Sequence, residues 1–224
     1  MDHVRISRPA DSPLVESITL TRFTAAGEAL MQPDGCWDIA ILNLGSGPFV
    51  LRTGLTTRPD IVEHKPGDEI LTISFRPNAF MPLMPGEVMR NEGVVLDSFG
   101  RRDFWLGPEV REMPTFETAD VFVERLVRDE VIETNPVVAS VVEGHPMAMS
   151  ERTLQRHFLK TTGLTYKHFT LIQRAQKAMA MLRSGQPAAD VVFALGYADQ
   201  AHMINSLRQI MGQTPGQIVR EVAG

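Results

Sequence analysis

The sequence predicts an α+β fold made of two domains, a small β-barrel at residues 1–135 and an all-α domain at residues 136–224. In the first part, short β-rich segments are separated by turn signals, which is typical of a small sandwich or barrel. In the second part, apolar residues recur at helical spacing almost to the end of the chain. There one pattern, a polar helix start followed by a helix, a glycine and a threonine, occurs twice. We therefore expect two similar helical units joined by one long helix.

Four strands are expected in the first part. They span residues 18–23, 37–42, 49–52 and 70–75, and turn signals rich in Pro, Gly and Asp lie at residues 32–35, 45–48, 58–60 and 65–68. The extreme N-terminus, including His3, is expected to be a tail. Residues 80–107 are rich in Pro, Gly and Met and favour no particular element.

A helix is expected within residues 115–134. Its apolar residues Phe122, Val123, Leu126 and Val127 lie one turn apart and form a stripe. Two interpretations of this stripe stay open: it covers its own barrel, or it is the surface of a homodimer. The domain boundary is expected at residues 135–136, because the residue before a proline is disfavoured in a helix.

The second part has the local signals of two helix-turn-helix units. A three- to four-residue turn containing glycine between two helices is typical of this motif. The expected boundaries are Ser150 and Thr165 as N-caps, a long helix to about residue 184, Pro187 as a helix start, Gly196 and Gly212 as helix ends, and Pro215 as a residue that prevents the last helix from resuming.

Charge is distributed unevenly along the chain. The net charge is −5, but residues 136–224 hold 9 Lys and Arg against 5 Asp and Glu, whereas the remainder holds 13 against 22. A positive segment attracts phosphates. No run of 18 apolar residues and no apolar signal core occur, so we expect a cytoplasmic protein that does not bind membranes.

Helical periodicity places basic and amide side chains on one side of each unit. Arg152, Gln155, Arg156 and Lys160 share the outer face of the first helix, and Ala201, His202, Asn205, Arg208 and Gln209 share that of the second. Arginine and glutamine pair with guanine and adenine edges in the major groove, so the expected partner is double-stranded DNA. Arg174 and Lys177 on the long helix are candidates for phosphate contacts. The alternative in each case is a solvated helix face.

These segments also resemble a known family. SERTLQRHF at residues 150–158 and TGLT at 162–165, with GYADQAH at 196–202 and LRQIMGQTP at 207–215, resemble the C-terminal domain of the AraC/XylS transcriptional regulators. PDGCWD at residues 33–38, GLTTRP at 54–59 and ISFRPNAF at 73–80 resemble the small cupin-like sensory domain of some members. The resemblance implies a DNA-binding regulator that responds to a small-molecule effector.

The resemblance also implies which residues face the groove, and shows two departures. The matching positions are Arg152, Gln155 and Arg156 in the first unit, and Gln200, Ala201, His202, Ile204 and Asn205 in the second. Asn205 stands where the family often has arginine. Gly144 and Pro146 should break or shorten the helix before Ser150. An alternative is therefore a binding module that acts through protein partners, with a degenerate first unit.

The barrel is a candidate sensor rather than an enzyme. Trp37, Phe75 and Arg76 are the candidate ligand residues, because an arginine beside apolar side chains can hold an anion by a bidentate contact. Their alternative is ordinary core and surface. This part has two histidines, His3 and His64, which does not suit a metal enzyme, and the lone Cys36 is expected to be a small buried residue. We expect no catalytic site, metal or cofactor, although a barrel enzyme fused to a DNA-binding domain stays as a third hypothesis.

Overall fold

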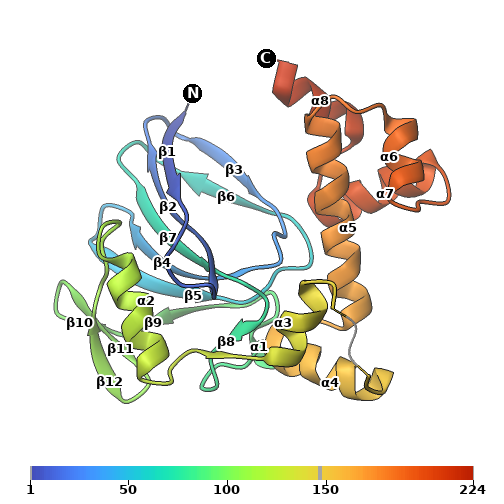
Figure 1. Ribbon diagram of the computed structural model, residues 1–224. Coiled ribbons are helices and arrows are strands. Elements are labelled where there is room, and N and C mark those ends of the chain that lie inside the picture. Colours follow the sequence, from blue (N-terminus) through green and yellow to red (C-terminus); the bar gives the residue numbers. More distant parts are fainter. Residues whose placement is uncertain (1, 146–147, 224) are drawn as a thin grey trace.

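A computed structural model describes residues 2–145 and 148–223 of the chain. A β-rich N-terminal part lies beside an all-helical C-terminal part, and the long helix α5 (Tyr166–Arg183) runs along the boundary between them (Figure 1). The two parts confirm the expected α+β class.

The main sheet of the N-terminal part has six antiparallel strands. Their order is β1 (His3–Arg8), β2 (Val15–Phe23), β7 (Glu69–Phe75), β4 (Trp37–Asn43), β5 (Pro48–Thr53) and β9 (Gly93–Leu96). The four expected strands correspond to β2, β4, β5 and β7. The expectation of an N-terminal tail is wrong, because residues 3–8 pair with β2 along their whole length. Both faces of β1 are largely exposed, so its residues do not alternate between buried and exposed as those of a half-buried strand do.

Three smaller sheets complete this part. β3 (Gly27–Met31) pairs with β6 (Asp60–His64), and we call this pair the β3–β6 ribbon. β8 (Ala79–Phe80) pairs with β13 (Glu133–Thr134), while β10 (Ser98–Phe99), β11 (Asp103–Leu106) and β12 (Glu109–Glu112) form a three-stranded sheet. Residues 80–107, for which the sequence favours no particular element, therefore include part of β8, the strands β9 to β11 and the short helix α1 (Gly86–Met89).

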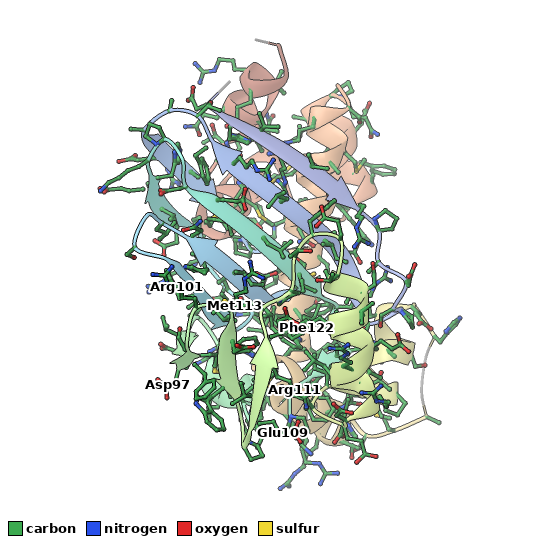
Figure 2. All side chains as sticks on the ribbon, turned by 90° about the vertical axis from the view of Figure 1, so that its left-hand side faces the viewer. Asp97, Arg101, Glu109, Arg111, Met113 and Phe122 are labelled. Carbon is green, nitrogen blue, oxygen red and sulfur yellow. The ribbon has the colours of Figure 1, made fainter. Side chains whose placement is uncertain are left out.

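Helix α2 (Ala119–Arg128) covers the N-terminal part beside β10–β12 (Figure 2). Phe122, Val123 and Leu126 are buried, and the Phe122 ring lies 6.2 Å from that of Phe104. Arg111 of β12 binds Asp129 at the end of α2, with Nη1 2.6 Å from Oδ2. Phe122, Val123 and Leu126 therefore pack on their own domain, whereas Val127, the fourth residue of the stripe, is exposed. This favours the interpretation that the stripe covers its own barrel, and the homodimer surface stays a prediction.

The helices of the C-terminal part begin and end close to the expected residues. They are α3 (Pro136–Val142), α4 (Glu151–Thr162), α5, α6 (Ala188–Ala194), α7 (Gln200–Met211) and α8 (Pro215–Ala223). Ser150 Oγ accepts a hydrogen bond from the backbone N–H of Thr153, and Thr165 Oγ1 accepts one from His168. Gly163 and Gly212, with φ of 74° and 72°, end α4 and α7 in the left-handed conformation that glycine adopts without strain.

Two helix signals have different consequences in the structure. α3 has only seven residues and is followed by Gly144 at φ 82°, as the break near that glycine predicts; Pro146 lies outside the described residues. The helix before Pro215 does not resume, since α7 ends at Met211. Pro215 instead begins a further helix, α8, because proline is well suited to the first turn, where its missing N–H has no helical partner. Among the described residues, no helix combines the length and apolar character needed to span a bilayer.

Candidate nucleic-acid interface

The outer face of α4 is a continuous polar surface. Arg152, Gln155, Arg156 and Lys160 are exposed, whereas Phe158 on the opposite side is fully buried. The four exposed residues line one open groove of about 620 Å³, together with Thr153, Leu159 and Glu87. The structure thus brings together the candidate contacts of the first unit.

The positive charges of this face lack carboxylate partners within the chain. In the described ranges, Arg152, Arg156 and Lys160 have no carboxylate at ion-pair distance. Lys160 Nζ instead lies 5.6 Å from the centre of the Phe80 ring, which belongs to the N-terminal part. Exposed, uncompensated cations are the groups that phosphates and base edges attract.

The outer face of α7 has a different chemistry. Gln200, His202, Asn205 and Arg208 are all exposed, and the opposite side, with Met203 as its first buried residue, is part of the core. Arg208 Nη2 lies 3.5 Å from Asn205 Oδ1. Four polar side chains but only one guanidinium make this face less positive than that of α4.

The N-terminus of α7 orients His202. Asp199 caps the helix by accepting a hydrogen bond from the His202 backbone N–H at 2.7 Å. The ring Nδ1 of His202 accepts one from the Ala198 backbone N–H at 3.3 Å, and the centres of the His202 and Tyr197 rings lie 5.4 Å apart, with the rings nearly perpendicular. Because Nδ1 is the acceptor, a neutral His202 carries its proton on Nε2 and presents a hydrogen-bond donor there.

The two candidate phosphate contacts on α5 differ in their surroundings. Lys177 is exposed. The Arg174 guanidinium lies 4.4 Å from the centre of the Tyr197 ring, and its Nε is buried with no hydrogen-bond partner in the described part of the chain. Arg174 therefore packs α5 against the turn before α7, a contact that helical periodicity alone does not reveal.

The three candidate ligand residues do not share a pocket. Trp37 and Phe75 stack at 4.2 Å in the core, where the Trp37 Nε1–H donates to the Ala79 carbonyl oxygen. Arg76 lies on the surface, with its Nε 3.1 Å from Glu16 Oε2. Strand alternation explains the separation, because Trp37 and Phe75 point to the apolar face while their neighbours Asp38 and Ser74 point to the other. Cys36 is buried, as expected.

Comparison with known proteins identifies the C-terminal part. Residues 145–221 match the family described as "Helix-turn-helix domain". This segment is an AraC-type helix-turn-helix domain. Over 74 residues the chain is 36% identical to the "HTH-type transcriptional regulator NimR" of Escherichia coli (strain K12), and the aligned segment covers 32% of this chain and 26% of that protein.

Two solved structures of ToxT from Vibrio cholerae are similar to the chain over most of its length. One has a TM-score of 0.45 and 9% identity, covering 92% of this chain and 98% of ToxT. The other, ToxT bound to (E)-4-(8-methylnaphthalen-1-yl)but-3-enoic acid, has a TM-score of 0.40 and 7% identity, covering 88% and 98%.

Contacts between the AraC-type domain and the N-terminal part are a feature that the sequence did not reveal. Gly163 and Gly212 are recognisable from sequence as helix ends, but each also meets the other domain closely. A Cβ placed on Gly163 would lie 2.2 Å from the Gly86 carbonyl oxygen, and one on Gly212 would lie 3.0 Å from Pro59 Cγ. A glycine that ends a helix and one that allows a close approach look the same in a sequence.

Glu87 of α1 is an acidic residue in the wall of the α4 groove, beside Arg152 and Arg156. We expect Glu87→Gln to strengthen DNA binding about two- to fivefold at low salt, because it removes a charge that repels phosphates across a solvated groove. The gain should shrink as salt is raised. Fluorescence anisotropy with a labelled duplex measures both effects.

The matched control for this change is Glu124→Gln, an exposed glutamate of α2. It alters the net charge equally but lies outside the α4 groove. An equal gain from both variants would mean that overall charge, and not the position of Glu87, sets the affinity.

Proposed function

We propose that the chain is a DNA-binding transcriptional regulator whose N-terminal domain, residues 1–135, responds to a small-molecule effector and whose residues 136–224 bind DNA. The main support is the pair of exposed helices α4 and α7, one in each helix-turn-helix unit. The proposed DNA contacts are Arg152, Gln155, Arg156, Lys160, Arg174, Lys177, Gln200, His202, Asn205 and Arg208.

A difference in charge supports a division of work between the two units. The α4 face carries two arginines and a lysine, whereas the α7 face carries one arginine. In this proposal α4 supplies most of the electrostatic affinity, and α7 reads bases through amides and the His202 ring.

Contacts at the ends of both helices support control by the N-terminal domain. The end of α4 touches Gly86 through Gly163, and the end of α7 lies against Pro59 through Gly212. Gln32 Nε2 also donates to the Met211 carbonyl oxygen at 2.6 Å. In this proposal the N-terminal domain sets the separation of α4 and α7, so an effector that shifts the domain changes how well both fit the duplex.

A second candidate function is a binding module that acts through protein partners. Phe193 of α6 favours it, because this aromatic side chain, which lies in the second unit, is 90% exposed. Large exposed aromatics are typical anchors of protein interfaces. Two further features are consistent with this alternative: helix α3 is short, and Asn205 stands where the family often has an arginine.

Selection of full-length protein against a random-sequence duplex library, followed by footprinting, tests the proposal. We expect one monomer to protect two half-sites on one face of the duplex with centres about 34 Å apart, because α4 and α7 would enter successive major grooves. Affinity should fall steeply with salt. Protection of one half-site would mean that one unit engages DNA, and failure to select any sequence would favour the protein-partner alternative.

A further inference from the structure

A cavity of about 480 Å³ lies between the main sheet and the β3–β6 ribbon. Its lining includes Asp2, Glu28, Asp34 and Asp38, and among the described lining residues Arg5 is the one arginine or lysine. Sheet hydroxyls, apolar residues of the sheet and the ribbon, and the side chains of His3 and His64 complete the wall. The cavity therefore has an excess of negative charge, and its volume lies in the range of small-molecule sites.

Asp38 has an unsatisfied oxygen in this wall. Its Oδ2 accepts a hydrogen bond from Thr53 Oγ1 at 3.2 Å, whereas its Oδ1 is buried and has no hydrogen-bond partner in the described parts of the chain. Burial raises the pKa of Asp38, although nearby hydroxyls and Arg52 act in the opposite direction. A buried acceptor without a donor is costly, so a ligand that brings an N–H group there would be favoured.

Asp34 places a second carboxyl near Asp38. Its Oδ1 accepts a hydrogen bond from the Cys36 backbone N–H at 2.9 Å. Although the residue as a whole is exposed, desolvation of the carboxyl and then the negative charge of Asp38 raise the pKa of Asp34 to about 7. A carboxyl whose ionisation is disfavoured by burial and by a neighbouring negative charge is stabilised by a cation placed beside it.

We propose that this cavity binds a small organic cation, an aliphatic amine or guanidine, with an N–H donor on Asp38 Oδ1 and its charge shared by Asp34 and Asp38. This chemistry is opposite to the anion expected at Arg76. Arg76 is paired with Glu16 and lies outside the cavity, whose carboxylates repel an anion.

The β3–β6 ribbon connects this site to the AraC-type domain. Leu30 lines the cavity and also lies near the end of α7, where its Cδ1 is 3.5 Å from a Cβ placed on Gly212. Two residues on, Gln32 donates to Met211. Only this regulatory consequence rests on the proposed function; binding of the cation is tested without DNA.

Three four-carbon probes test the charge preference on the full-length protein: 1,4-diaminobutane, 1,4-butanediol and succinate. Isothermal titration calorimetry and thermal unfolding at about pH 8, above the raised pKa of Asp34, measure binding. We expect the diammonium probe to bind with a stoichiometry of one and to raise Tm. The neutral and the anionic probes should neither bind nor raise Tm, because carboxylates form charge-assisted hydrogen bonds with a cation only.

Variants assign the binding to the cavity. Asp38→Asn and Asp34→Asn should each weaken diamine binding about tenfold or more, since each removes a charged partner of the ligand. Asp190→Asn on α6, an exposed aspartate outside the cavity, should have no effect. The second cavity variant keeps the test valid if Asp38→Asn fails to fold.

The proposal is overturned if the diol or succinate binds as well as the diamine, if no probe binds, or if neither cavity variant weakens binding. DNA binding of the ligand-free protein is measured separately. A protein that binds the diamine in this way but no DNA would refute the proposed function and leave the cation site standing, and the reverse result would refute the cation site alone.

Discussion

Replacing Arg156 by alanine is expected to weaken binding to a selected DNA site by about 1–3 kcal/mol, the loss typical of an arginine that reads a base. Arg156 is exposed, has no carboxylate partner in the described part of the chain, and lines both the α4 groove and a neighbouring one of about 490 Å³ beside Asn135 and His157. A guanidinium in this position can donate two parallel hydrogen bonds to guanine O6 and N7. Fluorescence anisotropy with the selected duplex and a scrambled duplex measures the loss and its sequence dependence.

Two controls separate base recognition from general electrostatics. Lys177→Ala on α5 should weaken both duplexes alike and reduce the salt dependence, as loss of a phosphate contact does. Arg183→Ala removes an exposed arginine at the end of α5, where Nη2 lies 3.8 Å from Glu221 Oε2, and should change neither quantity. A folded Arg156→Ala protein with unchanged affinity for the selected site would remove Arg156 from the interface.

The C-terminal domain could be predicted in detail because its signals are local. Ser150 and Thr165 cap helices within three residues of themselves, and Gly212 ends a helix at its own position. The polar face of α4 likewise follows from a spacing of three and four residues. Each of these expectations needs only a short window of sequence.

The N-terminal domain could be predicted only in part, because its pairings span long stretches of chain. Gly27 pairs with His64 in the β3–β6 ribbon, and His3 pairs with Phe23 at the sheet edge. The local sequence of a strand does not show which other strand it pairs with. The ligand residues illustrate the same limit: Trp37 and Asp38 are adjacent, but the fold places one in the core and the other in the cavity.

The second large effect is expected from Gly163→Ala. The left-handed φ of 74° at Gly163 costs about 1–2 kcal/mol with an alanine side chain. The added Cβ would also lie 2.2 Å from the Gly86 carbonyl oxygen, and overpacking of this kind costs about a further 1–3 kcal/mol. We therefore expect the free energy of unfolding to fall by the sum of both terms, as measured by urea denaturation of the full-length protein.

Two further variants separate the terms. Gly185 has a φ of 84°, and a Cβ added there would have no neighbouring atom within 4 Å, so Gly185→Ala should show the backbone cost alone. Gly86→Ala should show the contact cost alone, because no left-handed φ is involved and its Cβ would lie 2.5 Å from Gly163 N and Thr161 O. A Gly163→Ala protein no less stable than Gly185→Ala would mean that the two domains separate without cost.

The same variants test whether the N-terminal domain positions α4 for DNA. In Gly86→Ala the AraC-type domain is chemically unchanged, yet the added Cβ must push α1 and the end of α4 apart. If contacts at Gly86 and Pro59 set the separation of α4 and α7, the affinity for a selected two-half-site duplex should change in Gly86→Ala, while the affinity for a duplex with one half-site should not. A folded Gly86→Ala protein that binds both duplexes as the unmodified chain does would show that the domain contact does not control DNA binding.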